Sequence, residues 1–155
     1  MAEHPHHPPD EVGEQHGLAY ARFRPPTAVR GGIVVLHGAG SCKESHFDFA
    51  HAAREAGFEA IAFDARGHGA SGGRLDGRAI DDVVAIASLL PRPLALRGSS
   101  MGGYFALVSA RVAGAGAVVA VCPASGGGLL RGLDAGRLTF TADRAALGEL
   151  FSNNH

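Results

Sequence analysis

At 155 residues the chain has the length of one domain, and a hydrophobic content of 46% is enough for a single core. The formal net charge of −1 gives no reason to expect nucleic acid or an anionic membrane as a partner, and no apolar run approaches the roughly 18 residues of a membrane span. Only two cysteines are present, Cys42 and Cys122, which favours a reducing compartment over a disulfide framework, and we expect a cytoplasmic protein.

Residues 1–16 are predicted to be a disordered leader. The segment is rich in proline near its start and lacks the apolar core of a signal peptide. His4, His6 and His7 lie close together, but the prolines among them oppose a regular ligand geometry. We therefore expect no metal site here, and no metal or cofactor elsewhere.

Between residues 17 and 123, apolar segments alternate with helical patterns. Strands are predicted at 17–23, 33–36, 60–63, 94–96 and 117–121, and helices at 47–57, 76–90 and 101–112. Short apolar runs separated by amphipathic helices are typical of a parallel sheet covered on both faces. We expect a three-layer α/β/α sandwich with a mostly parallel sheet.

The composition changes beyond residue 123. Residues 125–128 are predicted to be a flexible glycine-rich stretch, and residues 131–150 to be partly helical. We therefore divide the chain into the leader 1–16, a core 17–123, and a segment 124–155 of different character.

A G-x-S-x-G sequence at residues 98–102 follows one predicted strand and begins the next helix. Such a turn holds its serine in a strained backbone and exposes the hydroxyl, and Gly98 and Gly102 supply clearance around Ser100. Serine is a poor nucleophile until a base activates it. Ser100 is thus the candidate nucleophile, and the N–H group of Met101 is a candidate oxyanion donor.

A second oxyanion donor is expected from the loop at residues 37–40, which follows an earlier strand. Its glycines let the main chain turn N–H groups inward. Ala39 is the preferred donor and Gly40 the reserve. His37 ends the strand directly, so we expect it to orient the loop and not to act as a base.

Three motifs in order, at residues 37–40, 64–71 and 98–103, make the chain resemble the α/β-hydrolase superfamily, within it the serine aminopeptidase S33 or acylglycerol lipase-like branch. The resemblance covers roughly residues 17–123. It implies Ser100 as nucleophile, Ala39 and Met101 as oxyanion donors, and residues 64–71 as a bracing loop in which Arg66 and His68 are structural. It further implies hydrolysis of ester, amide or peptide bonds of small substrates through an acyl-enzyme on Ser100.

The resemblance also places the triad acid and histidine after two further strands, which would lie beyond residue 155. Asp134 and Asp143 fall in what resembles the start of a cap insertion, at 124–155. We therefore expect a C-terminally truncated hydrolase whose last strands are missing. Its sheet would end in an open apolar edge through which oligomers could form. The alternative is a non-catalytic or inactive scaffold without the triad acid and histidine.

A nucleotide-binding module is the other alternative for the fold. The glycines at 38 and 40 resemble the start of a dinucleotide fingerprint, but Lys43 stands where its third glycine would be. Lys43 also follows cysteine where a phosphate-binding loop needs glycine, so this alternative is rejected.

Overall fold

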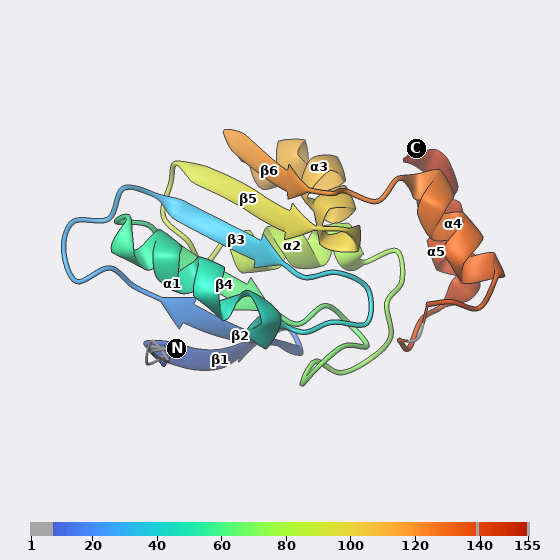
Figure 1. The fold of residues 1–155 in the computed structure, drawn as a ribbon, viewed down its shortest axis with the longest axis horizontal. Helices are drawn as coiled ribbons and strands as arrows, with labels where there is room; N and C mark the ends of the chain where they lie inside the picture. Colours follow the sequence, from blue (N-terminus) through green and yellow to red (C-terminus); the bar gives the residue numbers. More distant parts are fainter. Residues whose placement is uncertain (1–7, 139, 155) are drawn as a thin grey trace, which may run out of the picture.

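The computed structural model describes residues 8–138 and 140–154. Six strands form one sheet in the order β1-β2-β4-β3-β5-β6, shown in Figure 1. The strands are β1 Glu11–Gln15, β2 Leu18–Phe23, β3 Gly32–Leu36, β4 Glu59–Phe63, β5 Leu94–Ser99 and β6 Ala117–Val121. The helices are η1 Lys43–His46, α1 Phe47–Glu55, α2 Ala79–Ala87, α3 Met101–Ala113, α4 Gly126–Asp134 and α5 Arg144–Asn153.

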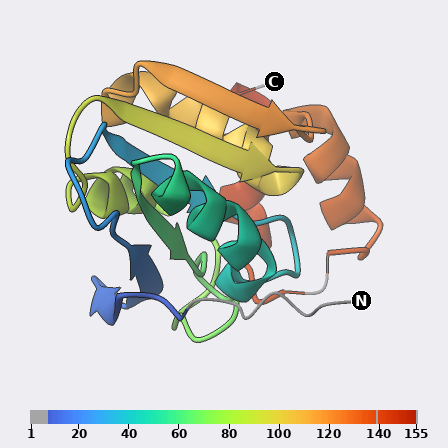
Figure 2. The same cartoon turned by 60° about the vertical axis from the view of Figure 1, so that its left-hand side comes forward.

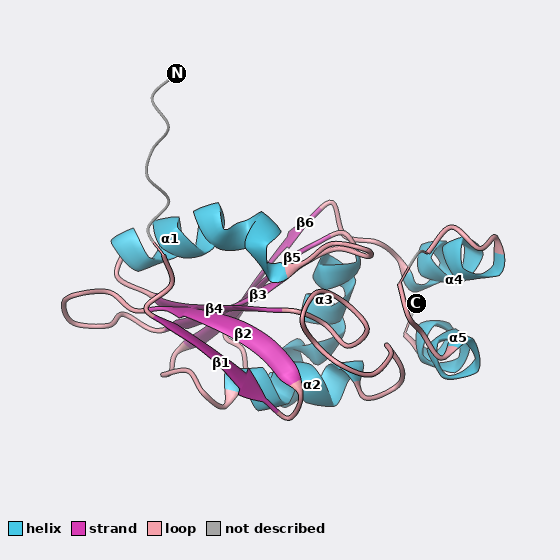
Figure 3. Cartoon of the chain, turned by 90° about the horizontal axis from the view of Figure 1, so that it is seen from below, coloured by secondary structure: helices cyan, strands magenta, loops and turns pink. Residues whose placement is uncertain are grey.

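The sheet is mostly parallel and has helices on both faces. Strands β3, β4, β5 and β6 run parallel, while β2 joins β4 antiparallel and pairs with β1 as a hairpin. Helix α1 lies on one face, and α2 and α3 lie on the other (Figure 3). The predicted α/β sandwich is confirmed.

Two apolar clusters fill the space between the layers. The larger one packs the sheet against α2 and α3 and includes Leu96, Ile86 and Phe105. The smaller one packs β2 and β4 under α1 and includes Phe23 and Ala50. Burial on both faces explains why the parallel strands read as continuous apolar runs.

The expected leader is wrong over its second half, because Glu11–Gln15 forms the edge strand β1. Its residues alternate between exposed and half-buried, and Val12 is 69% exposed. A mostly polar edge strand has little apolar signal, and pairing with β2 decides its structure. The rest of that prediction, residues 1–7 with His4, His6 and His7, lies outside the described residues.

The glycine-rich stretch at 125–128 is not a flexible link but the start of α4. The Ser125 hydroxyl caps the helix by accepting a hydrogen bond from the Gly128 N–H group at 3.0 Å. Gly126 packs so closely on the backbone oxygens of Phe151 and Asn154 that a side chain would not fit. Contact with α5 therefore accounts for Gly126.

Helices α4 and α5 pack together at the carboxyl ends of the strands, as Figures 1 and 2 show. Phe151 of α5 is fully buried and meets the Tyr104 ring edge-on, with ring centroids 5.5 Å apart. Residues up to Asn154 are thus joined to the core. The interpretation of 124–155 as the start of a cap stays a prediction.

None of the helices in the described residues has the length and apolarity needed to cross a lipid bilayer.

Candidate active site

The three motifs meet at one edge of the sheet. Each follows a parallel strand, and the carboxyl ends of parallel strands lie at the same edge. β3 leads into the loop 37–42, β4 into the loop 64–71, and β5 into Ser100.

Ser100 forms the turn between β5 and α3 with φ 54° and ψ −117°. A non-glycine residue seldom adopts a positive φ, and this strain is the one the motif predicts. The turn is held by three hydrogen bonds: the Ser100 N–H group donates to the Val121 carbonyl at 3.0 Å, and the Ser100 carbonyl accepts from the N–H groups of Tyr104 at 3.1 Å and Ala124 at 3.0 Å. The residue is exposed to solvent.

Two glycines let the strand, the turn and the helix pack closely. A Cβ atom at Gly98 would collide with the Gly102 backbone, and one at Gly102 would collide with the carbonyl oxygens of Leu36 and His37. Only glycine allows the end of β3 to approach the first turn of α3 this closely. The sequence expectation of clearance on both sides of Ser100 is confirmed.

The loop after β3 lies beside Ser100. A Cβ atom at Gly38 would stand 3.4 Å from the Ser100 Cβ atom. The Gly40 N–H group donates to His68 Nε2 at 3.0 Å and is therefore occupied. Ala39, between them, is half-buried, and within the described residues its N–H group has no hydrogen-bond acceptor. At the start of α3, the Met101 N–H group has no partner inside the helix either.

His37 and His68 connect this loop to the loop after β4. His37 Nε2 accepts from the Ala65 N–H group at 3.0 Å, and His37 Nδ1 lies 2.7 Å from the Gly38 carbonyl. His68 Nδ1 lies 3.0 Å from the Arg66 carbonyl. Each ring thus accepts through Nε2 and donates through Nδ1, which requires the neutral form. Burial lowers the pKa of both side chains.

Asp64 is fully buried and anchors the same two loops. Its carboxylate accepts from Lys43 Nζ at 2.9 Å, from the Lys43 N–H group at 2.7 Å and from the Ala70 N–H group at 2.9 Å. Burial alone would raise the pKa of Asp64, but these hydrogen bonds outweigh it and the pKa is lowered. Asp64 is therefore a fixed structural carboxylate.

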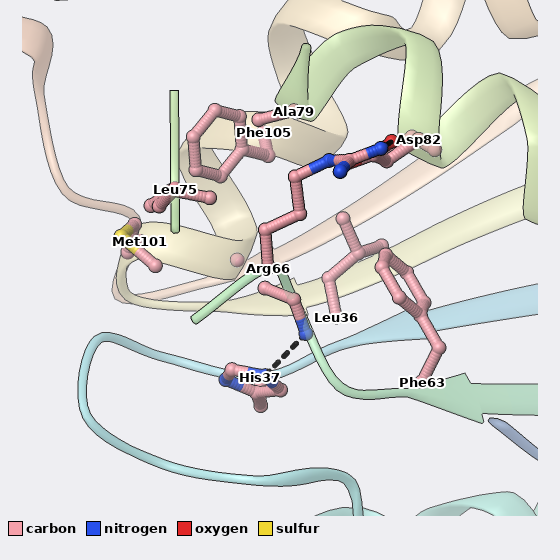
Figure 4. Close-up of a pocket in the computed structure, with 12 residues that line it drawn as sticks. Leu36, His37, Phe63, Arg66, Leu75, Ala79, Asp82, Met101 and Phe105 are labelled. Atoms are coloured by element: carbon pink, nitrogen blue, oxygen red, sulfur yellow. Dashed lines mark hydrogen bonds and ion pairs between the residues drawn. The ribbon is translucent and has the colours of Figure 1, made fainter. Parts of the chain in front are cut away.

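Arg66 makes a two-pronged ion pair with Asp82 of α2, with N–O distances of 2.6 and 2.9 Å. The pair borders a small cavity of about 20 Å³ between the sheet, α2 and α3, drawn in Figure 4. This is room for about one water molecule. Met101 and His37 also line it, but it is too small to hold a substrate. Arg66 and His68 are thus both engaged in structural contacts, as the resemblance implies.

The described residues bring no base to Ser100. Its hydroxyl has no hydrogen-bond partner among them, and both nearby imidazoles are engaged elsewhere. Asp134 and Asp143 do not join the site: Asp134 ends α4, and Asp143 caps α5 by accepting from the Ala146 N–H group at 3.1 Å. Nor do the described residues contain a cluster of three or more His, Cys, Asp or Glu side chains suited to a metal ion.

Sequence reasoning missed three parts of this arrangement. It considered Lys43 only as a mismatch to nucleotide-binding motifs, whereas Lys43 is the buried partner of Asp64. It placed Asp82 in the predicted helix 76–90 but did not identify Arg66 as the ion-pair partner of this side chain. It gave no role to Phe140, whose ring lies 4.4 Å from that of His68. The available signal for the first was that Lys43, the single lysine of the chain, follows one loop motif while an aspartate begins the next.

Comparisons with known proteins agree with this geometry. The model of the alpha/beta hydrolase family matches residues 33–153. A monoacylglycerol lipase from Paleococcus ferrophilus is 29% identical, with a TM-score of 0.61 over 68% of this chain and 43% of that chain. Mouse alpha/beta hydrolase domain-containing protein 10 is 26% identical, with a TM-score of 0.65 over 81% of this chain and 53% of that one.

A soluble variant of monoglyceride lipase from Saccharomyces cerevisiae, solved with a substrate analogue, shares the fold at 23% identity and a TM-score of 0.62, over 75% of this chain and 45% of that one. The chain therefore spans about half the length of these solved structures. No curated protein matched.

Proposed function

The chain belongs to the alpha/beta hydrolase family, and on that premise we propose that it is the nucleophile-bearing part of a serine hydrolase acting on small esters or amides. The observation that carries the proposal is Ser100 itself, exposed on a strained turn at the start of α3 with the Gly38 loop against it. The lipases among its structural relatives favour an ester.

In the proposed reaction the Ser100 oxygen attacks the substrate carbonyl carbon and its proton passes to a base. The carbonyl oxygen becomes an oxyanion between the N–H groups of Met101 and Ala39. Collapse of this intermediate expels the alcohol or amine, which takes up the proton, and leaves an ester on Ser100. Water then attacks that ester, and the acid product and free serine are released. No cofactor or metal is needed for these steps.

The oxyanion donors follow from which N–H groups remain available. His68 occupies the Gly40 N–H group, so Gly40, the reserve in the sequence prediction, is not the donor we propose. The Ala39 N–H group is not occupied in this way, and the Met101 N–H group also benefits from the positive end of α3.

The base is proposed to come from polypeptide outside residues 1–155. His37 and His68 are held neutral as hydrogen-bond acceptors, each for a backbone N–H group of the other's loop. Loss of a triad member in serine hydrolases lowers kcat by about 10⁴- to 10⁶-fold. The 155 residues alone are expected to turn over slowly.

A non-catalytic scaffold is the second candidate, favoured by the absence of a base at Ser100 among the described residues. Labelling with a fluorophosphonate separates the two, because this reagent needs a reactive serine. We expect slow labelling at Ser100 that Ser100→Ala abolishes and the neighbouring change Ser99→Ala leaves intact. A folded sample with no label, or equal label in the Ser100→Ala variant, would favour the scaffold.

A further inference from the structure

Three aromatic rings stand in a row where the loops after β3 and β4 meet the chain between α4 and α5. The ring centroids of His37 and His68 lie 4.9 Å apart, and those of His68 and Phe140 lie 4.4 Å apart. The planes of the last two rings are inclined by 33°, and at this separation Phe140 covers one side of the imidazole. Each ring comes from a different segment, so the row joins three parts of the chain.

The backbone fixes Phe140 at this place. The Leu75 N–H group donates to the carbonyl of the adjacent Thr141 at 2.9 Å, within a short parallel bridge. A Cβ atom at Gly67 would collide with the same Thr141 carbonyl, so glycine is required for this approach. Gly67 and Leu75 lie on either side of His68 in the sequence. The contact between the Phe140 and His68 rings is therefore set by backbone packing on both sides of it.

The His68 ring carries this contact on to the loop 37–42. Its Nε2 atom accepts from the Gly40 N–H group at 3.0 Å, and its Nδ1 atom lies 3.0 Å from the Arg66 carbonyl. Gly40 directly follows Ala39, which supplies an oxyanion donor in the proposed reaction. If the imidazole took up a proton, Nε2 would become a donor and release the Gly40 N–H group.

The polar groups around His68 do not keep its ring neutral by themselves. Burial lowers the pKa of His68 and outweighs the Arg66 carbonyl and the Asp64 carboxylate, both of which raise that pKa. The loop after β3 adds the His37 imidazole, whose charged form would repel a charged His68. His68 is only 4% exposed, and Phe140 is the ring that the chain between α4 and α5 places over it. The cover that Phe140 provides thus favours the neutral acceptor form.

We propose that Phe140 is a positioning residue for the proposed reaction. Its ring holds the His68 imidazole against the Gly40 N–H group and so fixes the loop 37–42. That loop in turn presents the Ala39 N–H group to the oxyanion. The role of Ala39 rests on the proposed function, whereas the chain of contacts from Phe140 to Gly40 stands without it. Through this ring the segment between α4 and α5 acts on the site without touching the substrate.

Nuclear magnetic resonance tests the contact in the 155-residue chain. Phe140→Ala should raise the pKa of His68, followed through its imidazole nitrogen shifts, because water then solvates the charged ring. At neutral pH the Gly40 amide should exchange with heavy water about fivefold faster or more, because its acceptor is lost. Phe140→Tyr keeps the ring and should retain both values of the unmodified chain.

Phe58 provides the matched control. It is also half-buried, and its ring packs against the Arg30 guanidinium at 4.8 Å, next to the start of β4. Phe58→Ala should leave the His68 pKa and Gly40 exchange unchanged. Far-ultraviolet circular dichroism checks that each variant is folded, and Phe140→Leu, a milder truncation, should shift both readouts in the same direction. Unchanged values in folded Phe140 variants, or equal changes in Phe58→Ala, would overturn the proposal.

Fluorophosphonate labelling separates this proposal from the proposed function. At neutral pH, Phe140→Ala should label at Ser100 about tenfold more slowly than the unmodified chain, because an oxyanion donor is displaced. The two rates should converge as the pH rises, because His68 then regains its neutral form. An unmodified chain without label would refute the proposed function, while the resonance measurements would still decide whether Phe140 holds His68 against Gly40. Equal labelling rates at neutral pH would overturn the positioning role.

Discussion

Replacing Phe151 with alanine tests whether α5 is part of the core. The side chain is fully buried, and its ring meets those of Tyr104 at 5.5 Å and Phe105 at 6.4 Å. Truncation removes the buried ring and leaves a cavity between α5 and α3. Such changes cost about 3 to 5 kcal/mol, and each lost aromatic pair contributes about 0.5 to 1.5 kcal/mol of this.

A loss of that size is a large share of the roughly 5 to 15 kcal/mol that stabilises a typical domain. We expect the melting temperature to fall by about 10 °C, given about 2 to 4 °C per kcal/mol at this length. Urea denaturation gives the free energy directly, and the slope of that curve reports the surface exposed on unfolding. The slope should stay unchanged, because α5 unfolds together with the sheet.

The exposed residue Val112 gives the control, since Val112→Ala should change the free energy of unfolding by less than about 0.5 kcal/mol. A loss below about 1 kcal/mol in Phe151→Ala would refute the reasoning. So would a smaller slope, because it would mean that α5 separates from α3 before the sheet unfolds. In either case residues 144–153 would be an appendage to the fold.

Three further predictions concern the loops around Ser100. Gly102→Ala should destabilise the fold by about 1 to 3 kcal/mol and abolish fluorophosphonate labelling, because the added Cβ atom would push the Leu36 and His37 carbonyls away. Unchanged labelling of a folded variant would contradict this prediction. Lys43→Met should cost about 3 to 5 kcal/mol in urea denaturation by leaving Asp64 buried and unpaired, whereas an equal stability would show that the charge is not buried. Burial lowers the pKa of His37 and His68 below 6.5, so the unfolded chain binds protons at these side chains before the folded chain does. The free energy of unfolding should therefore fall as the pH drops below about 6.5. His68→Gln should reduce this dependence, and an identical pH profile in that variant would exclude the mechanism.

The layers of the fold were readable from the sequence because parallel strands buried on both faces leave continuous apolar runs. The prediction of 33–36 differs from β3 by one residue, and that of 117–121 agrees with β6. The turn at Ser100 was readable too, because both glycines of the motif lie within two residues of Ser100, although the contact that requires Gly102 is with the distant carbonyls of Leu36 and His37. Both signals are local, and for that reason a pattern can carry them.

What could not be predicted depends on pairing and packing partners outside the segment itself. β1 exists because β2 pairs with it, and the glycines of 126–128 are helical because Ser125 caps them and Gly126 packs against α5. Arg97 was outside the predicted strand 94–96, since a charged residue argues against a buried strand, yet β5 continues to Ser99. In each case tertiary packing overrides the local preference.

The two histidines show why the proposed catalysis needs a base from elsewhere. If His68 took a proton from Ser100, its Nε2 would no longer accept from the Gly40 N–H group. The Gly40 N–H group would then lose the acceptor that fixes the loop, at the moment when the adjacent Ala39 N–H group must hold the oxyanion. The same conflict applies to His37 and the Ala65 N–H group. A histidine that fixes the loop in its neutral form therefore cannot also serve as the base, and the two tasks must fall to different side chains.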